Sequence, residues 1–171
     1  MKKVILSTAM MVLLLLPAVG QLKHVKGISN AGITCGTSGN GTLFGAGYSH
    51  YLQPKWIVNV NALYENGKVE STRFKNLIVN AGMDYTCFEA GEFLYLNAGL
   101  SLFAGSEKLT GEDARVGEKK NITFGPAGNI NAELYVSPAF LFQLKAEQYY
   151  SPLSDLGKWF PVYSLSLKYC F

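Results

Sequence analysis

The stretch KWFPVYSLSLKYCF, residues Lys158 to Phe171, alternates between two kinds of side chain from Tyr163 onward. Small or polar residues separate large apolar or aromatic ones, which are Tyr163, Leu165, Leu167, Tyr169 and Phe171. Because side chains alternate faces along a β-strand, such a strand has one apolar face and one polar face. A helix would scatter the same apolar residues around its circumference. The stretch is therefore predicted to be a strand.

This strand ends on the aromatic residue Phe171. It resembles the C-terminal strand through which the barrel-insertion machinery recognises bacterial outer-membrane β-barrels. The edge strand of a soluble β-sandwich can alternate in the same way, so the rest of the chain must separate the two interpretations.

The same alternation recurs from Gln21 onward in segments of about ten residues bounded by turn residues. Seven further strands are predicted, at residues 26–36, 42–52, 55–65, 76–88, 93–105, 122–136 and 139–150. In the first of them, glycines blur the alternation. In the sixth, Pro126 predicts a bulge or bend, because proline lacks a ladder donor.

The connections alternate in length. Short turns are expected after the second, fourth and sixth strands, and longer polar loops at 65–73, at Ser106–Asn121 and at 151–157. Short periplasmic turns and longer outer loops are typical of outer-membrane barrels. The fold predicted is an all-β, antiparallel, up-and-down transmembrane β-barrel of about eight strands, with both ends of the chain on the periplasmic side. A soluble sandwich is disfavoured.

Several charged residues fall on the inward face of the predicted strands: Glu65, Asp84, Glu133, Lys145, Glu147 and Lys168. A barrel of eight strands is just wide enough for side chains to fill it. We therefore expect a polar, charge-paired, hydrated and side-chain-filled interior through which neither DNA nor protein could pass.

Residues 1–20 have the order of a secretory signal peptide: Lys2 and Lys3, an apolar run, and then small residues. Cleavage is expected near Gly20/Gln21, which leaves residues 21–171 as the barrel domain in the outer membrane. Without the two lysines, 13 basic residues face 12 acidic ones in the remainder. No direct binding of nucleic acid is predicted.

Three cysteines, Cys35, Cys87 and Cys170, match no metal-binding spacing and are expected to be small buried or lipid-facing side chains without a disulfide. Of the two histidines, His24 precedes the first strand and His50 has lipid-facing parity near a turn. No catalytic residue, cofactor or metal site is predicted.

An outer-membrane lipid-modifying enzyme would need a serine and a histidine on one face near a rim. His50 lacks a nearby acid in the sequence, and its candidate partners Ser38 and Ser49 have no supporting pattern. The charges of the interior are better explained by the need to pair buried charge.

Three segments, His24–Gly32, Leu94–Leu102 and Gly157–Tyr169, resemble the TraO family of conjugative-transposon proteins of Bacteroides-type bacteria. The resemblance follows the whole mature chain in order and length. It implies a part in the conjugal DNA-transfer apparatus at the outer membrane, alongside other transfer proteins, and it supplies no catalytic residues.

The expected function is a non-enzymatic outer-membrane component of a conjugative DNA-transfer apparatus. The alternatives are a general small outer-membrane barrel for envelope integrity or adhesion, with contacts through Ser106–Asn121, and a lipid-modifying enzyme. The expected partners are outer-membrane lipid, the insertion machinery through the strand ending at Phe171, and other conjugal-transfer proteins.

Overall fold

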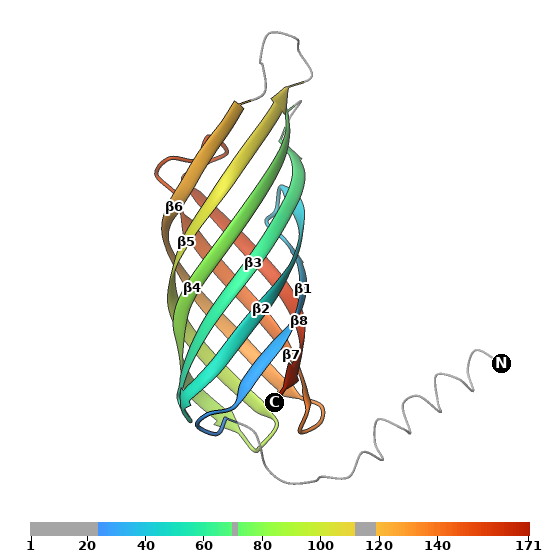
Figure 1. The fold of residues 1–171 in the computed structure, drawn as a ribbon, viewed down its shortest axis with the longest axis vertical. Coiled ribbons are helices and arrows are strands. Elements are labelled where there is room, and N and C mark those ends of the chain that lie inside the picture. The colour runs from blue at the N-terminus through green and yellow to red at the C-terminus, as the bar shows by residue number, and fades with distance from the viewer. Residues whose placement is uncertain (1–23, 70–71, 112–118) are drawn as a thin grey trace, which may run out of the picture.

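The structure, a computed structural model, describes residues 24–69, 72–111 and 119–171 (Figure 1). Eight antiparallel strands form a closed barrel in which each strand pairs with its neighbours in sequence and the first pairs with the last. The strands are β1 (Ser29–Thr37), β2 (Gly41–Gln53), β3 (Trp56–Val69), β4 (Thr72–Ala90), β5 (Leu94–Gly111), β6 (Lys119–Tyr135), β7 (Phe140–Tyr150) and β8 (Trp159–Cys170). The predicted fold is confirmed. The predicted signal peptide and its cleavage point lie outside the described residues.

The strands are staggered around the barrel. Starting at Cys170 on β8, the paired residues lead from strand to strand back to Phe160, ten residues earlier on β8; the path runs through Asn30, Ser49, Asn59, Gly82, Ser101, Ala127 and Tyr149. Such a stagger requires strands that tilt steeply against the barrel axis, as Figure 1 shows. With eight strands it leaves an interior that side chains can fill.

The outer surface carries an apolar belt. Leu100 is 76% exposed, and Leu102 and Ile130 are exposed to nearly the same degree. Aromatic pairs lie toward both ends of the belt: Trp56 with Tyr85 at one end, and Tyr150 with Trp159 at the other. An apolar belt bounded by aromatic residues is the surface expected of a barrel in a bilayer. None of the described residues belongs to a helix that could cross a membrane.

The first strand starts later than predicted, because Gly27, with a φ of +91°, lies in the turn that precedes Ser29. The glycines that blur its alternation are required by the seam with β8. A Cβ added to Gly32 would overlap the carbonyl oxygen of Leu167, and one added to Gly36 would overlap that of Tyr163. Only glycine allows the two backbones to approach this closely.

Two predicted outer loops are wrong in their bounds. The predicted loop at 65–73 is a strand hairpin in which β3 and β4 stay paired as far as Val69 and Thr72. In the predicted loop Ser106–Asn121, β5 and β6 stay paired as far as Leu109 and Lys119. These strands continue past the apolar belt, where both faces can be polar. The alternation that marks a lipid-facing strand therefore stops before the hydrogen bonding does.

The bulge predicted at Pro126 is also absent, because the register of β5 and β6 passes through Leu102 and Pro126 without a shift. Pairing of β6 with β7 ends at Ala127, so β6 is paired on one side only at the proline. A proline is tolerated on such a free edge. The two register shifts in the described pairings lie near the opposite end of the barrel, at Tyr51/Gln53 and at Thr86/Phe88.

A charge on the belt should be costly. Leu144 lies on the outer face of β7 and is 63% exposed. Replacing Leu144 by Arg should destabilise the barrel by about 2–4 kcal/mol if the residue lies at the mid-plane of a bilayer. Unfolding by urea in lipid vesicles, followed by the change in gel mobility between folded and heated protein, measures the loss.

The matched control is Leu153→Arg, in the loop that follows β7, where Leu153 is 49% exposed. This variant should unfold at the same urea concentration as the wild type. Equal effects of the two substitutions would refute the assignment of the belt to lipid.

Candidate functional site: a filled barrel closed at two levels

The charged residues predicted to point inward are all buried: Glu65, Asp84, Glu133, Lys145, Glu147 and Lys168. Lys145 Nζ lies 2.7 Å from Glu147 Oε1. Lys168 Nζ donates a hydrogen bond of 3.1 Å to Ser49 Oγ. Buried charges are tolerated in proteins when they are paired and hydrogen-bonded, so these contacts explain how Lys145, Glu147 and Lys168 can lie inside the barrel.

Side-chain amides extend this polar interior. Asn129 Nδ2 and Asn131 Nδ2 donate to the two carboxylate oxygens of Asp84 at 3.0 and 3.1 Å. Asn97 Nδ2 donates to Asn131 Oδ1 at 2.8 Å. Opposite Asp84 on β5 is Gly99, where an added Cβ would overlap Asp84 Oδ1. A connected network of this kind holds the middle of the barrel in one arrangement.

Above this polar middle, toward the end where the long hairpins project, an apolar layer crosses the barrel. Strands β2 to β8 each contribute to one buried cluster: Leu43, Leu63, Ile78, Phe103, Ala127, Tyr149 and Val162, with Phe160 packed against it. Tyr149 and Phe160 stack with their ring centroids 5.0 Å apart. The layer separates the polar middle from the solvent at that end.

The layer adds an apolar level to the side-chain-filled, polar interior that the sequence predicts. Leu63 and Ile78 point inward although Tyr64 and Leu77, their neighbours in sequence, point outward. Two adjacent apolar residues hide the two-residue period, which is why a sequence pattern does not reveal the layer.

A second closure lies at the opposite end, where the chain enters the barrel. His24 is only 5% exposed, and its ring stacks on Tyr95 with a centroid distance of 3.7 Å and an interplanar angle of 8°. His24 Nε2 lies 2.9 Å from Glu133 Oε2. The backbone of His24 has a φ of +46°, an unfavourable conformation that persists because the surrounding contacts hold it.

Two tyrosines complete the second closure. The Tyr51 hydroxyl donates to Glu133 Oε2 at 2.9 Å and lies 3.0 Å from the Tyr135 hydroxyl. Gln143 Nε2 donates to Glu133 Oε1 at 3.1 Å. We call His24, Tyr51, Tyr95, Glu133 and Tyr135 the periplasmic plug, after the side of the membrane on which the sequence predicts this end of the barrel to lie. Sequence reasoning placed His24 correctly before the first strand but missed its role, because no local pattern marks a segment that folds back into the barrel.

The other histidine does not form a catalytic site. His50 is half-buried on the outer face of β2 near its end, as predicted, and its Nδ1 lies 3.0 Å from Ser29 Oγ. Ser29 Oγ also contacts the Tyr48 hydroxyl at 2.9 Å. Neither Ser38 nor Ser49 is its partner: Ser38 bonds Glu65, and Ser49 bonds Lys168. Among the described residues no carboxylate orients His50, so the pair lacks the third member of a triad.

The cysteines and acids of the described chain form no metal site. Cys35 and Cys87 lie exposed on the outer wall, and Cys170 is buried within the barrel. Nowhere in residues 24–69, 72–111 and 119–171 do three or more His, Cys, Asp or Glu side chains group in a way that could hold a metal ion.

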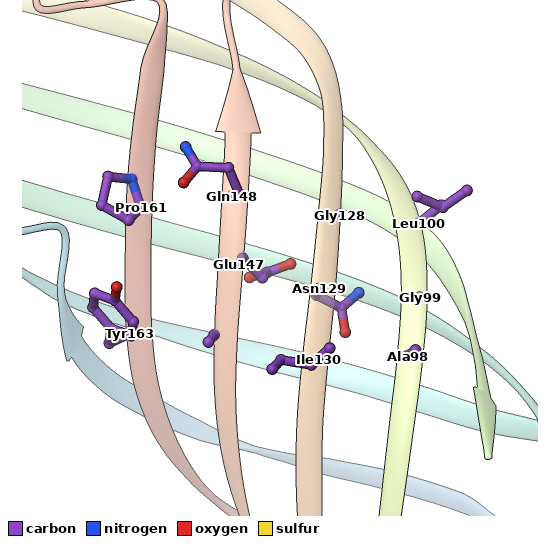
Figure 2. A pocket seen from close by; sticks show the side chains of 11 residues that line it. Ala98, Gly99, Leu100, Gly128, Asn129, Ile130, Glu147, Gln148, Pro161 and Tyr163 are labelled. Atoms are coloured by element: carbon purple, nitrogen blue, oxygen red, sulfur yellow. The ribbon is translucent and has the colours of Figure 1, made fainter. Parts of the chain in front are cut away.

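A shallow hollow lies in the outer wall over β5 to β8, where small side chains alternate with large ones (Figure 2). Ala98, Gly128 and Ala146 line it together with Ile130 and Tyr163. Ala98 lies on β5, Gly128 and Ile130 on β6, Ala146 on β7 and Tyr163 on β8. Figure 2 shows these strands side by side. No serine, cysteine or histidine is among the described residues that line the hollow, so it lacks the Ser–His or Cys–His pair of a hydrolase.

The geometry agrees with solved structures of small outer-membrane barrels. The chain is similar to Ail, the attachment invasion locus protein of Yersinia pestis, with a TM-score of 0.59 and 17% identity over 86% of this chain and 100% of that one. It is similar to the outer membrane protein OprG of Pseudomonas aeruginosa, with a TM-score of 0.62 and 14% identity over 87% of this chain and 98% of that one. It is also similar to Neisserial surface protein A, with a TM-score of 0.58 and 13% identity over 84% of this chain and 93% of that one. No family model and no curated protein matches the sequence.

These likenesses, together with the belt and the closed ladder, define the class of fold. The chain is an eight-stranded antiparallel β-barrel of the outer-membrane type. At these identities the likeness extends to the fold alone.

Removing the histidine of the periplasmic plug should destabilise the barrel. In His24→Ala, Glu133 loses one of its partners while it stays buried, which should cost about 2–4 kcal/mol. Urea unfolding of the protein in micelles measures the loss.

The control is His50→Ala, which removes a half-buried ring from the outer wall and should cost less than half as much. If His24→Ala and the wild type unfold at the same urea concentration, the periplasmic plug does not contribute to stability.

Proposed function

We propose that this protein is a non-enzymatic outer-membrane surface barrel that acts through contacts made at its extracellular end and supports envelope integrity or adhesion. The observation that carries the proposal is an interior closed at two levels, by the apolar layer and by the periplasmic plug. A barrel of this width filled by side chains is unsuited to transport. The surfaces left for function are the outer wall and the strands that extend beyond the belt.

The extended strands support this proposal. In Figure 1, the upper ends of β3, β4, β5 and β6 rise above the rest of the barrel. The described part of the β5–β6 hairpin runs on to Gly111 and from Lys119, well past the last apolar side chains of the belt. A rigid ladder outside the membrane presents side chains to a partner at little cost in conformational entropy. Ail, one of the similar structures, is by its name an attachment invasion locus protein.

Shortening this hairpin tests the proposal. In the full-length protein, residues 107–121 are replaced by Asn-Gly, which joins the paired residues Ser106 and Ile122 through a two-residue turn. The variant should still insert and show heat-modifiable gel mobility, because the belt is intact. Attachment of the cells to host-type surfaces, or their resistance to detergent and chelator, should fall to the level of a deletion strain. Wild-type behaviour in both assays would refute the proposal.

A second candidate is a role in conjugal DNA transfer, supported by the resemblance of three segments to the TraO family. The first of these segments contains His24 of the periplasmic plug, and the other two lie mainly in β5 and β8. The resemblance therefore lies in residues that build the barrel, and the residues of the outer tip do not carry it.

Mating assays separate the two candidates. If the protein is a transfer component, deleting its gene should lower mating frequency by orders of magnitude, while detergent resistance and the lipid A profile stay as in the parent strain. An unchanged mating frequency refutes the transfer role. An altered lipid A profile would instead favour a lipid-modifying enzyme.

A further inference from the structure

A cluster of positive charges covers the outer face of the extended strands. Five exposed cationic side chains belong to it, which we call the basic patch: Lys68 on β3, Arg73 and Lys75 on β4, Lys108 on β5 and Lys120 on β6. They share outward parity with lipid-facing residues of the same strands, as Lys75 does with Leu77 and Lys120 with Ile122. The patch is therefore on the outside of the wall.

The register brings like charges together. Lys75 pairs with Lys108, and Lys108 pairs with Lys120, so that three ammonium groups form one row across three strands. Lys68 lies opposite Arg73 in the same way. Like charges directly opposite each other destabilise a sheet. Lys68, Arg73 and Lys108 already have a polar or electrostatic partner, so an anion beside Lys75 and Lys120 would lower the cost that remains.

The described carboxylates of these strands do not supply an anion for Lys75 and Lys120. Glu65 and Glu107 lie at the same level of the wall but point inward, with 3% and 0% exposure. Lys75 and Lys120 have no hydrogen bond or ion pair within the described part of the chain. The connections between these strands carry Glu70, Glu112, Asp113 and Glu118 in the sequence. The row that contains Lys75 is therefore the part of the basic patch at which binding of an external anion is best tested.

The patch lies at the outer boundary of the belt. On β4, Lys75 comes two residues outside Leu77, which is 52% exposed, and on β6 Lys120 comes two residues outside Ile122, which is 68% exposed. Residues just beyond the last lipid-facing side chains lie at the level of lipid headgroups. On this side of the barrel those are the headgroups of the outer leaflet.

The patch also contains a recess of suitable size. The cations of β3, β4 and β5 line a hollow of about 640 Å³ together with the polar side chains of Asn66 and Thr110. Lysine ammonium groups bind phosphate as point charges, and arginine adds a bidentate fork. Hydroxyl and amide groups beside them can bind the sugar or phosphate oxygens of a headgroup.

We propose that the basic patch binds the phosphate groups of the anionic glycolipid of the outer leaflet and so fixes the extended β3–β6 wall against the membrane surface. This inference goes beyond the proposed function and does not depend on it. Each cation near an anionic lipid surface adds to the attraction, so neutralising two of them should weaken binding by about ten- to thirtyfold.

The experiment uses the full-length protein in neutral detergent micelles, titrated with bisphosphorylated lipid A and followed by native mass spectrometry. The variant Lys75→Gln/Lys108→Gln should bind about ten- to thirtyfold more weakly than the wild type. Its matched control, Lys26→Gln/Lys55→Gln, removes two exposed lysines from the opposite end of the barrel and should bind within about twofold of the wild type. Dephosphorylated lipid A is the matched ligand and should bind far more weakly to the wild type.

Heat-modifiable gel mobility confirms that each variant folds, and Lys120→Gln takes the place of the double variant if that one does not. Equal affinity of the wild type and the row variant would overturn the proposal. So would equal affinity of the wild type for lipid A with and without phosphate, since the glycolipid would then be held by its acyl chains alone. A loss of affinity in the control variant as large as in the row variant would also overturn it.

Discussion

Closure of the barrel between β1 and β8 is the constraint on which the rest of the structure depends. In hydrocarbon an open sheet edge would leave backbone N–H and C=O groups without partners, at a cost of several kcal/mol each. The seam brings Gly32 and Gly36 against carbonyl oxygens of β8 and joins the strands with a stagger of ten residues. Strand number and stagger together set the tilt and width of the barrel. The interior that follows is narrow enough to be filled.

The filled interior is organised by height. An apolar layer that includes Leu43, Phe103 and Tyr149 lies toward the outer end, the amide network around Asp84 lies in the middle, and His24 closes the other end against Tyr95 and Glu133. Apolar packing at one level and connected side-chain hydrogen bonds at the others leave few ways for the strands to slip in register. The charged residues of the interior, among them Asp84 and Glu133, take part in these contacts between strands.

The exterior divides at the boundary of the apolar belt. Below that boundary the side chains meet lipid, so strand residues alternate and small changes of charge are costly. Above it the ladder of β3 to β6 continues with polar side chains on its outer face, among them the row of Lys75, Lys108 and Lys120. A rigid strand hairpin that leaves the membrane with its charges already placed is suited to recognition at the cell surface, which is where both the proposed contacts and the proposed lipid site lie.

The sequence by itself determined the strands, their faces and the closed fold. The two-residue period of Leu94 to Leu102 or Tyr163 to Phe171 is imposed by lipid on one side and polar side chains on the other, and it can be read locally. The same two-residue period predicted that Glu133, Lys145 and Lys168 point into the barrel. Tertiary structure alone decided what these residues meet. His24 reaches Glu133, 109 residues away, because closure puts the entering chain beneath β6. The apolar layer joins Leu63 and Ile78 to residues of five other strands, because the stagger brings these positions to one height. Neither contact can be predicted from the two-residue period of the sequence, since both depend on the stagger of the strands around the whole barrel.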